Sequence, residues 1–252
     1  MELVLEAAER SQVFSRVIVV GPPELDTAIC AARVTPSVQR VEQGESLVDN
    51  IRRAFAAAGL AEAERLFLAT ADIPLTAPHE LARFAAGVDG SSADACVALA
   101  RPLQSAAHRM LFGAYRRTMI IARGGPYLLG NLYALRSCVL EFADVIGRAR
   151  RVRHQSSIAN LAWALAALGL IGTRAAPALQ TWLRLVMARA MWLRRGDYGR
   201  IPAIAPSTDR ICGAAMALVR NHISVGFVDV GADGACYDVD NDEQYEAVKA
   251  IL

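Results

Sequence analysis

The sequence is poor in the residues that usually hold structural metals or form disulfides. Its 252 residues include five cysteines and four histidines, none of which stands in a Cys-x-x-Cys pair or at zinc-ligand spacing. Scattered cysteines of this kind are typical of a reducing compartment, so we expect a cytoplasmic protein without structural zinc or disulfides. A G-x-S-x-G nucleophile elbow is also missing, and this excludes one common hydrolase signature.

Lysine is almost absent, and arginine carries nearly all of the positive charge. Residues 1–100 contain 8 arginines and 14 acidic residues, whereas residues 101–220 contain 18 arginines and 4 acidic residues. Residues 221–252 are acidic again, with one lysine (Lys249) and 7 acidic residues. A basic middle predicts an anionic neighbour, which is a phosphorylated substrate, a lipid surface or a protein partner; a solvated basic face is the alternative. We expect no nucleic-acid partner.

No apolar run is long enough to cross a bilayer. The most apolar segment, residues 161–172, is about a dozen residues long, whereas a spanning helix needs about 20, so we predict a buried helix there. The acidic N-terminus is not a signal peptide. Residues 181–195 combine Trp182 and Trp192 with four arginines. This basic amphipathic helix either lies on an anionic membrane surface or packs on the sheet domain or a second subunit.

Helix and strand patterns alternate over the first hundred residues. The hydrophobic fraction of 54% leaves ample material for a core. Ser46 is a good N-cap for a helix that ends near Gly59. We predict helices at 3–14, 47–59 and 78–87 and strands at 16–21, 38–41, 66–69 and 93–100. This alternation predicts an α/β fold with a mostly parallel, Rossmann-like sheet.

The pattern changes after residue 100. Two strands, 118–122 and 131–135, are predicted to join through a glycine-rich bend, and the chain from 138 to 220 is mostly helical. A strand at 223–228 and a final helix follow, with Asp240 and Glu243 at capping-box spacing. We therefore predict an α/β domain made of residues 1–136 and 222–252. Residues 137–221 are predicted to form a helical, arginine-rich insertion.

Asp72 follows a short apolar run, residues 66–69, and stands two residues before Pro74. Such a run is typical of a buried strand in a parallel sheet. Ligands in open α/β sheets bind just beyond the carboxyl ends of these strands, where a carboxylate can hold a metal ion. The alternative is that Asp72 caps the helix that starts near Pro78 or stabilises a turn.

A second group of acidic residues precedes the last helix. Asp240 is explained by helix capping, but Asp238 is not. Asp72 and Asp238 offer the hard oxygen ligands that suit Mg²⁺, which takes one or two carboxylates together with substrate phosphates. A metal held in this way bridges phosphate oxygens during phosphoryl transfer, with arginine side chains assisting.

Four short motifs occur in an informative order. They are G-E-S-L-V-D-N at 44–50, T-A-D-I-P-L at 70–75, G-N-L-Y at 130–133 and D-V-D-N-D-E at 238–243. In this order they resemble the MobA-like nucleotidyltransferase family, whose domains are Rossmann-like and of GT-A type. The resemblance implies transfer of a nucleoside monophosphate from an NTP to a phosphorylated small-molecule acceptor, with Mg²⁺ as the cofactor.

The resemblance also assigns roles by position. Gly44 and Ser46 would line the nucleobase end of the pocket, and Asn131 would contact the acceptor. Asp72 and Asp238 would be the two catalytic, metal-binding carboxylates. In such enzymes a phosphate oxygen of the acceptor attacks the α-phosphate of the NTP, and pyrophosphate leaves.

One feature of the family is not found here. The family begins with a strand and a loop of the form L-A-G-G-x-G-x-R, followed by a lysine, which cradles the triphosphate. This chain starts at the helix that should follow that loop. Because the missing strand is central in the family's sheet, we expect a gap between its neighbours. Three explanations stay open: a start codon placed too late, a deliberately shortened chain, or a family member that has lost catalysis.

Three functions follow from these observations. The first is nucleotidyl transfer by the form that carries the loop, with weak or no activity in the 252-residue form. The second is a non-catalytic nucleotide-binding or scaffold protein. The third is a GT-A glycosyltransferase that uses residues 238–240 as a D-x-D metal motif, although the position of this motif near the C-terminus disfavours it.

Overall fold

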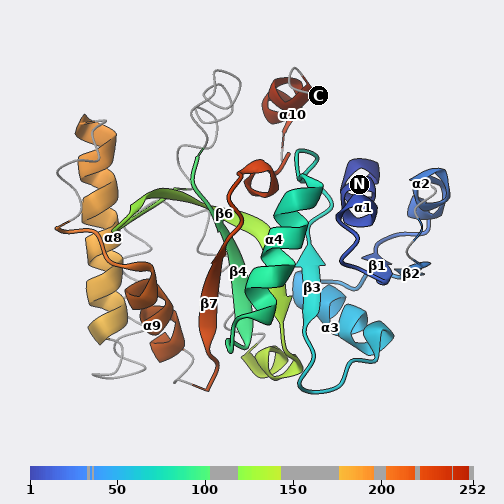
Figure 1. Cartoon of the computed structure of the whole chain (residues 1–252), viewed down its shortest axis with the longest axis horizontal. Coiled ribbons are helices and arrows are strands. Elements are labelled where there is room, and N and C mark those ends of the chain that lie inside the picture. Colours follow the sequence, from blue (N-terminus) through green and yellow to red (C-terminus); the bar gives the residue numbers. More distant parts are fainter. Residues whose placement is uncertain are drawn as a thin grey trace.

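The computed structural model describes residues 1–32, 35, 37–102, 119–142, 176–195, 203–218, 222–239 and 241–249. The predicted apolar helix at 161–172 and the predicted capping role of Asp240 lie outside these ranges. Figure 1 shows a central sheet with β1 and β2 beyond β3 on one side and α8 on the other.

The N-terminal part contains a small parallel sheet of two strands. The elements are α1 (Glu2–Ser11), β1 (Arg16–Val20), α2 (Leu25–Ala32), β2 (Ser37–Val41) and α3 (Leu47–Ala58). β1 pairs with β2 in parallel. Sequence reasoning predicted all of these except α2, whose eight residues are fewer than the window in which a helical period becomes clear.

The larger sheet contains three strands of one direction and a central strand of the other. In spatial order they are β3 (Leu66–Ala69), β6 (Gly125–Leu135), β4 (Ala95–Ala100) and β7 (Val225–Asp229). β6 is antiparallel to β3 and β4, whereas β4 and β7 are parallel. β5 (Ile120–Ala122) forms a hairpin with the start of β6. The predicted mostly parallel α/β sheet is confirmed.

Helices cover both faces of this sheet. α4 (Pro78–Asp89) buries Leu81, Phe84 and Val88, which are spaced as on one face of a helix. A Cβ at Gly87 would lie 2.4 Å from a Val228 methyl carbon, so the absence of a side chain lets α4 approach β7 closely. α3 contributes to a separate apolar cluster beneath the ends of β4 and β6.

The C-terminal half adds further helices. They are η2 (Ser137–Phe142), α8 (Ala176–Arg195), α9 (Thr208–Leu218), η4 (Gly234–Cys236) and α10 (Asp242–Lys249). Ala188 and Trp192 of α8 belong to the main core cluster. Asn241 Oδ1 accepts the Gln244 N–H at 3.0 Å, so the observed cap of α10 comes from Asn241.

The two sheets are not joined by backbone pairing within the described residues. β1 pairs only with β2, and β3 pairs only with β6. Although both strands are almost entirely apolar, neither contains a fully buried residue. We call the boundary between β1 and β3 the seam. The Phe14 and Phe67 rings make an edge contact across it, with centroids 5.6 Å apart. This separation agrees with the gap expected from the family resemblance.

Candidate functional site

The Asp72 loop, residues 70–77, begins at the carboxyl end of β3. Its first residue, Thr70, donates its N–H to the Asn131 carbonyl at 3.3 Å and so extends the pairing of β3 with β6. Ile73 is completely buried, and the Thr76 hydroxyl donates to its carbonyl at 2.9 Å. Asp72 is exposed. Because the N-cap of α4 is Ala77, the alternative that Asp72 caps this helix is wrong.

The Asp238 loop, residues 230–239, follows the carboxyl end of β7. It turns at Gly231, whose φ of 78° favours glycine, and continues through η4. The Val239 N–H then donates to the Asp72 carbonyl at 3.0 Å. This bond joins the two loops directly, although they lie far apart in the sequence. Asp238 itself is half-buried.

Asn131 lies at an irregularity of the sheet beside the Asp72 loop. Val97 pairs with Tyr133, but Leu99 pairs with Leu129, so the register of β4 and β6 shifts between these pairs. Such bulges reorient side chains and often occur beside active sites. Asn131 is 8% exposed and accepts the Thr70 N–H through its carbonyl oxygen. The structure therefore places Asn131 next to the loop that carries Asp72.

Gly44 and Ser46 lie in the loop between β2 and α3. The Gly44 N–H donates to Asn50 Oδ1 at 2.7 Å, and Ser46 Oγ accepts the Asp49 N–H at 3.1 Å as the N-cap of α3. A Cβ at Gly44 would lie 2.6 Å from the Asp49 Cβ. The contacts that the structure shows for Gly44 and Ser46 lie within this loop and α3. They explain why a glycine and a capping residue stand there.

Two buried carboxyl groups, Glu80 on α4 and Asp233 within the Asp238 loop, were missed by sequence reasoning. Glu80 and Asp233 are both completely buried. Burial raises the pKa of Glu80 above its usual value, although backbone N–H groups of Ala77 and Ala235 oppose this change. The only sequence signal for Glu80 is its position three residues after the N-cap, which is typical of a capping box.

The loops offer ligands that fit a divalent cation completed by substrate. Among the described residues, no three His, Cys, Asp or Glu side chains gather as a possible metal site. Mg²⁺ commonly takes only one or two carboxylates and fills its shell with waters and phosphate oxygens. Thr70 Oγ1, two residues before Asp72, is buried and has no hydrogen-bond partner in the described part of the chain. This hydroxyl is a further polar group on the Asp72 loop.

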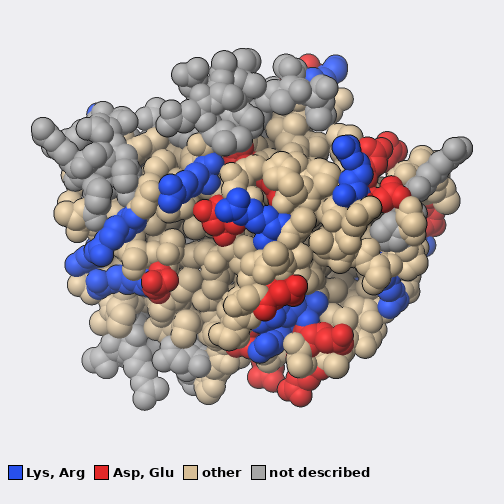
Figure 2. Space-filling model, in the orientation of Figure 1, with Lys and Arg blue, Asp and Glu red and all other residues tan. Residues whose placement is uncertain are grey.

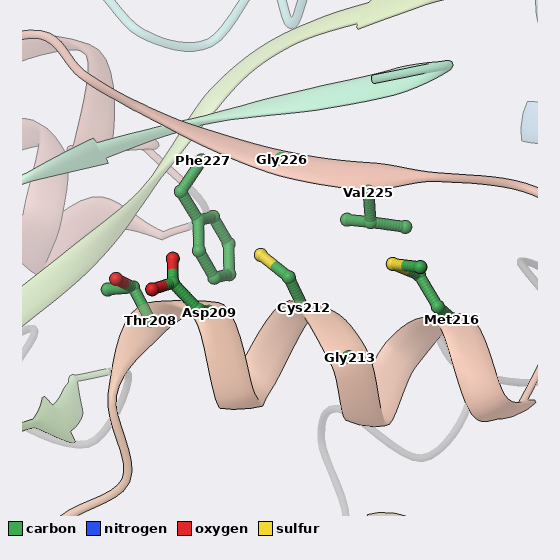
Figure 3. Close-up of a pocket in the computed structure, with 8 residues that line it drawn as sticks. All are labelled: Thr208, Asp209, Cys212, Gly213, Met216, Val225, Gly226 and Phe227. Carbon is green, nitrogen blue, oxygen red and sulfur yellow. The ribbon is translucent and has the colours of Figure 1, made fainter. Parts of the chain in front are cut away.

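A separate pocket of about 440 Å³ lies between α9 and β7. Figure 3 shows Cys212 and Met216 pointing from α9 toward β7, and Val225 and Phe227 pointing back. Burial raises the pKa of the Cys212 thiol, so this thiol is protonated at neutral pH and is a weak nucleophile. The pocket lies beside β7 itself, whereas the Asp238 loop follows the end of this strand. It is therefore distinct from the candidate site.

Charged side chains of both signs share the surface of the protein. Figure 2 shows blue side chains over the α8 side and the centre of this face, with red side chains among them. Several arginines have local partners: Arg40 pairs with Asp26 at 2.7 Å and Arg136 with Asp94 at 3.1 Å. Arg65 donates to the carbonyls of residues 88, 91 and 93. These arginines therefore have structural roles.

The sequence matches the family model for the MobA-like NTP transferase domain over residues 1–191. The chain belongs to the MobA-like NTP transferase family. This membership supports NTP transferase activity in general, and the family generally uses a divalent metal. No curated protein matches the sequence.

Two solved structures share the fold of this MobA-like protein. A hypothetical transferase from Thermus thermophilus is 21% identical, with a TM-score of 0.58 over 96% of this chain and 84% of its own. A CMP:2-keto-3-deoxy-manno-octonic acid synthetase complexed with CTP is 12% identical, with a TM-score of 0.51 over 99% and 86%. At these identities the likeness shows the fold alone.

In the part of the chain that the structure describes, no helix is long and apolar enough to cross a membrane.

Proposed function

We propose that this MobA-like protein transfers a nucleoside monophosphate from an NTP to a phosphorylated small molecule and releases pyrophosphate. The observation that carries the proposal is the 3.0 Å bond from the Val239 N–H to the Asp72 carbonyl. It holds two carboxylate-bearing loops together at the carboxyl edge of the sheet, where α/β proteins bind their ligands. Family membership supports the same chemistry.

Asp72 and Asp238 would hold Mg²⁺ between the two loops. When bound there, the ion would offset the negative charge of the phosphate oxygens. Both side chains suit this role because one is exposed and the other is only half-buried, so substrate can reach them. Neither aspartate needs to act as a base, because the attacking phosphate oxygen of the acceptor is already anionic.

The reaction proceeds by substitution at the α-phosphorus of the NTP. The acceptor oxygen forms a bond to this phosphorus, and the bond to the oxygen that bridges the α- and β-phosphates breaks. That bridging oxygen keeps the electron pair and leaves as part of pyrophosphate. Asn131, which lies beside the Asp72 loop at the bulge, would orient the acceptor through its amide.

Gly44 and Ser46 would line the nucleobase end of the substrate pocket. The loop that contains them follows the carboxyl end of β2 and begins α3. A loop in this place can present backbone N–H and C=O groups to a base, and Gly44 leaves room for close approach. The local contacts of both residues are compatible with this role, because they are directed toward α3 and use only some of the polar groups of the loop.

The α8 helix would contribute a peripheral contact with an anionic membrane surface. Trp192 packs into the core and is only 8% exposed, so it is unable to insert into lipid. Among the described side chains of α8, the exposed large apolar ones are Leu183, Val186 and Met187, which are 42%, 44% and 51% exposed. Their spacing places them along one side of the helix, with arginines nearby on the same helix.

Vesicle co-sedimentation tests this contact. The wild-type chain should sediment with vesicles that contain phosphatidylserine, and Met187→Asp should remain in the supernatant. Neutral phosphatidylcholine vesicles provide the comparison, because attraction to arginine needs anionic lipid. Equal sedimentation of both proteins, or no sedimentation of either, would contradict the membrane contact.

Pyrophosphate release tests the transfer reaction. A panel of NTPs is combined with phosphorylated acceptors, Mg²⁺ and a form of the protein that carries any upstream glycine-rich loop, either with the wild-type residue or with Asp72→Ala. We expect Asp72→Ala to lose activity on the order of 100-fold, the scale seen when one preorganised electrostatic group is removed. Asp89→Ala, at the exposed end of α4, is the control and should keep full activity.

The outcomes separate the competing functions. If Asp72→Ala releases pyrophosphate as fast as the wild type, the proposed mechanism is wrong. NTP binding without pyrophosphate release from any acceptor would instead favour the non-catalytic nucleotide-binding protein. Release of a nucleoside diphosphate from a sugar nucleotide would favour the glycosyltransferase.

A further inference from the structure

We propose that Glu80, Asp233 and Tyr237, here called the Glu80 network, position Asp72 and Asp238 relative to one another. In this role the three residues touch neither substrate nor metal; they act through the backbone of the two loops. The predicted effect on metal binding rests on the proposed function. The predicted effect on the relative position of the two loops, which is the structural part, does not.

Glu80 bonds to both loops with one carboxyl group. Oε2 accepts the Ala77 N–H at 2.7 Å, and Oε1 accepts the Ala235 N–H at 3.1 Å. Ala77 is the last residue of the Asp72 loop, whereas Ala235 lies in η4, within the Asp238 loop. A single side chain therefore bridges two segments that the sequence separates widely.

Helix capping alone does not account for the position of Glu80. A capping-box glutamate needs only the bond to the N-cap N–H. It can make this bond while its side chain stays exposed to solvent, so capping does not require burial. Glu80 is instead completely buried. Burying a carboxyl group is costly unless it is well hydrogen-bonded. The bond to Ala235 supplies the second partner and explains why the carboxyl group faces inward.

Asp233 and Tyr237 close the η4 turn from both ends. The Tyr237 hydroxyl donates to Asp233 Oδ2 at 2.7 Å, and both side chains are completely buried. The backbone N–H of Cys236 donates to the Asp233 carbonyl at 3.0 Å. Tyr237 immediately precedes Asp238. The buried phenol ring therefore fixes the backbone from which Asp238 projects.

The two loops are also in backbone contact at Gly234. A Cβ at this position would lie 2.1 Å from the Leu75 carbonyl oxygen and 2.6 Å from Glu80 Oε2. No side chain larger than hydrogen fits there without moving one loop. Together with the bond from Val239 to Asp72, this contact ties the loops on both sides of the two aspartates.

Loss of bonds in the Glu80 network should weaken metal binding, because a metal site shared by two loops needs precisely placed ligands. Ligands from two loops hold one ion well only when their supporting residues fix them to within about 0.5 Å. Glu80→Gln leaves one acceptor oxygen where two N–H donors must be satisfied, so one of the two bonds is lost. Tyr237→Phe keeps the ring and removes only the hydroxyl bond to Asp233.

Amide hydrogen exchange tests the structural part on the full chain. We expect the Val239 N–H to exchange about tenfold faster in Glu80→Gln and in Tyr237→Phe, because its bond to Asp72 opens more often. Neither substituted side chain bonds to Val239, so a change there reports movement of the loop. Val88→Ala is the control: it removes a side chain of α4 that is 1% exposed and lies outside the network.

Two results would overturn the proposal. One is wild-type exchange at Val239 in Glu80→Gln together with faster exchange at Ala235, which would limit Glu80 to a local bond. The other is equal acceleration of Val239 exchange in Val88→Ala, which would reduce the effect to general loss of stability. If Glu80→Gln does not fold, the same readings are taken on Tyr237→Phe.

Mn²⁺ binding, followed by water-proton relaxation, tests the link to the metal site. Mn²⁺ affinity should fall about 10-fold or more in Glu80→Gln, as is usual when the support of a metal ligand is removed, and should be unchanged in Val88→Ala. Unchanged affinity in Glu80→Gln would contradict the positioning role. If the wild type does not bind Mn²⁺, the proposed function fails, and Val239 exchange alone then decides the structural part.

Discussion

At the scale of single residues, Glu80 and Asp94 show how surroundings give two carboxyl groups opposite properties. Burial raises the pKa of Glu80, and the N–H groups of Ala77 and Ala235 only partly offset it. Burial also acts to raise the pKa of Asp94, but hydrogen bonds from Ser224 and Arg136 outweigh it, so this pKa is lowered. The two groups therefore change stability with pH in opposite directions.

Glu80 should make the protein relatively more stable at low pH. Its pKa in the folded state lies above its usual value of 4.5, so the folded state holds the proton more tightly than the unfolded chain. The contribution of this carboxyl group is fully present below pH 4.5 and is lost as the pH rises through the folded pKa. We expect the stability difference between wild type and Glu80→Gln to shrink on going from about pH 4 to about pH 8, measured by urea unfolding. A difference that grows would contradict the account.

Asp94→Asn provides the control of opposite sign. The pKa of Asp94 is lowered from its usual value of 3.8, so its contribution is present above pH 3.8 and is lost as the pH falls through the folded pKa. In the same urea series, the stability difference between wild type and Asp94→Asn should be largest near neutral pH. The two variants together thus separate a specific effect of Glu80 from a general effect of pH.

At the scale of elements, the sequence predicted strands and helices where local signals are strong. The β4 strand is apolar on both faces, and the helix that begins at Ser46 carries its cap and ends at Gly59, as predicted. The α2 helix was missed because its eight residues are too few for a clear helical period. The Asp72 and Asp238 loops were both identified, but their bond was not, since it depends on tertiary contacts between distant segments. The same reason hid Glu80 and Asp233.

The start of α3 allows capping and nucleotide contact at Ser46 to be separated. Ser46→Ala should cost about 1 kcal/mol of unfolding free energy, because the Asp49 N–H loses its acceptor. Ser46→Asn keeps a capping acceptor and should keep wild-type stability. If Ser46 also lies at the nucleobase end of the pocket, Ser46→Asn should weaken NTP affinity in calorimetry. Wild-type affinity in Ser46→Asn would limit Ser46 to capping.

At the scale of the whole molecule, the seam between β1 and β3 separates two sheets that differ in how fully their strands are paired and buried. β4 pairs on both sides and is buried along most of its length, whereas β1 and β3 each pair on one side. The family resemblance predicted this gap, because the strand that is central in the family's sheet was not found in the sequence. Composition and periodicity alone did not, because each strand has an ordinary apolar pattern.

Native-state hydrogen exchange, read by mass spectrometry, should reveal this division. Local opening is easiest where few apolar contacts are buried, so peptides from β1 and β2 should exchange before peptides from β4 and β6. β7 serves as the comparison, because it is also an edge strand but packs against α4 and α9. Equal protection of β1 and β4 would contradict the division into two sheets.

The central claim is that Asp72 and Asp238 hold one metal ion together, and a double-mutant cycle tests it most directly. Mn²⁺ affinity in the presence of an NTP is measured for wild type, Asp72→Asn, Asp238→Asn and the double variant by water-proton relaxation. Ligands of one ion act as a unit, so their effects are coupled. We predict that each single variant loses most of the affinity and that the double variant loses little more. Affinity that is unchanged in either single variant, or losses that simply add in the double variant, would contradict a shared site.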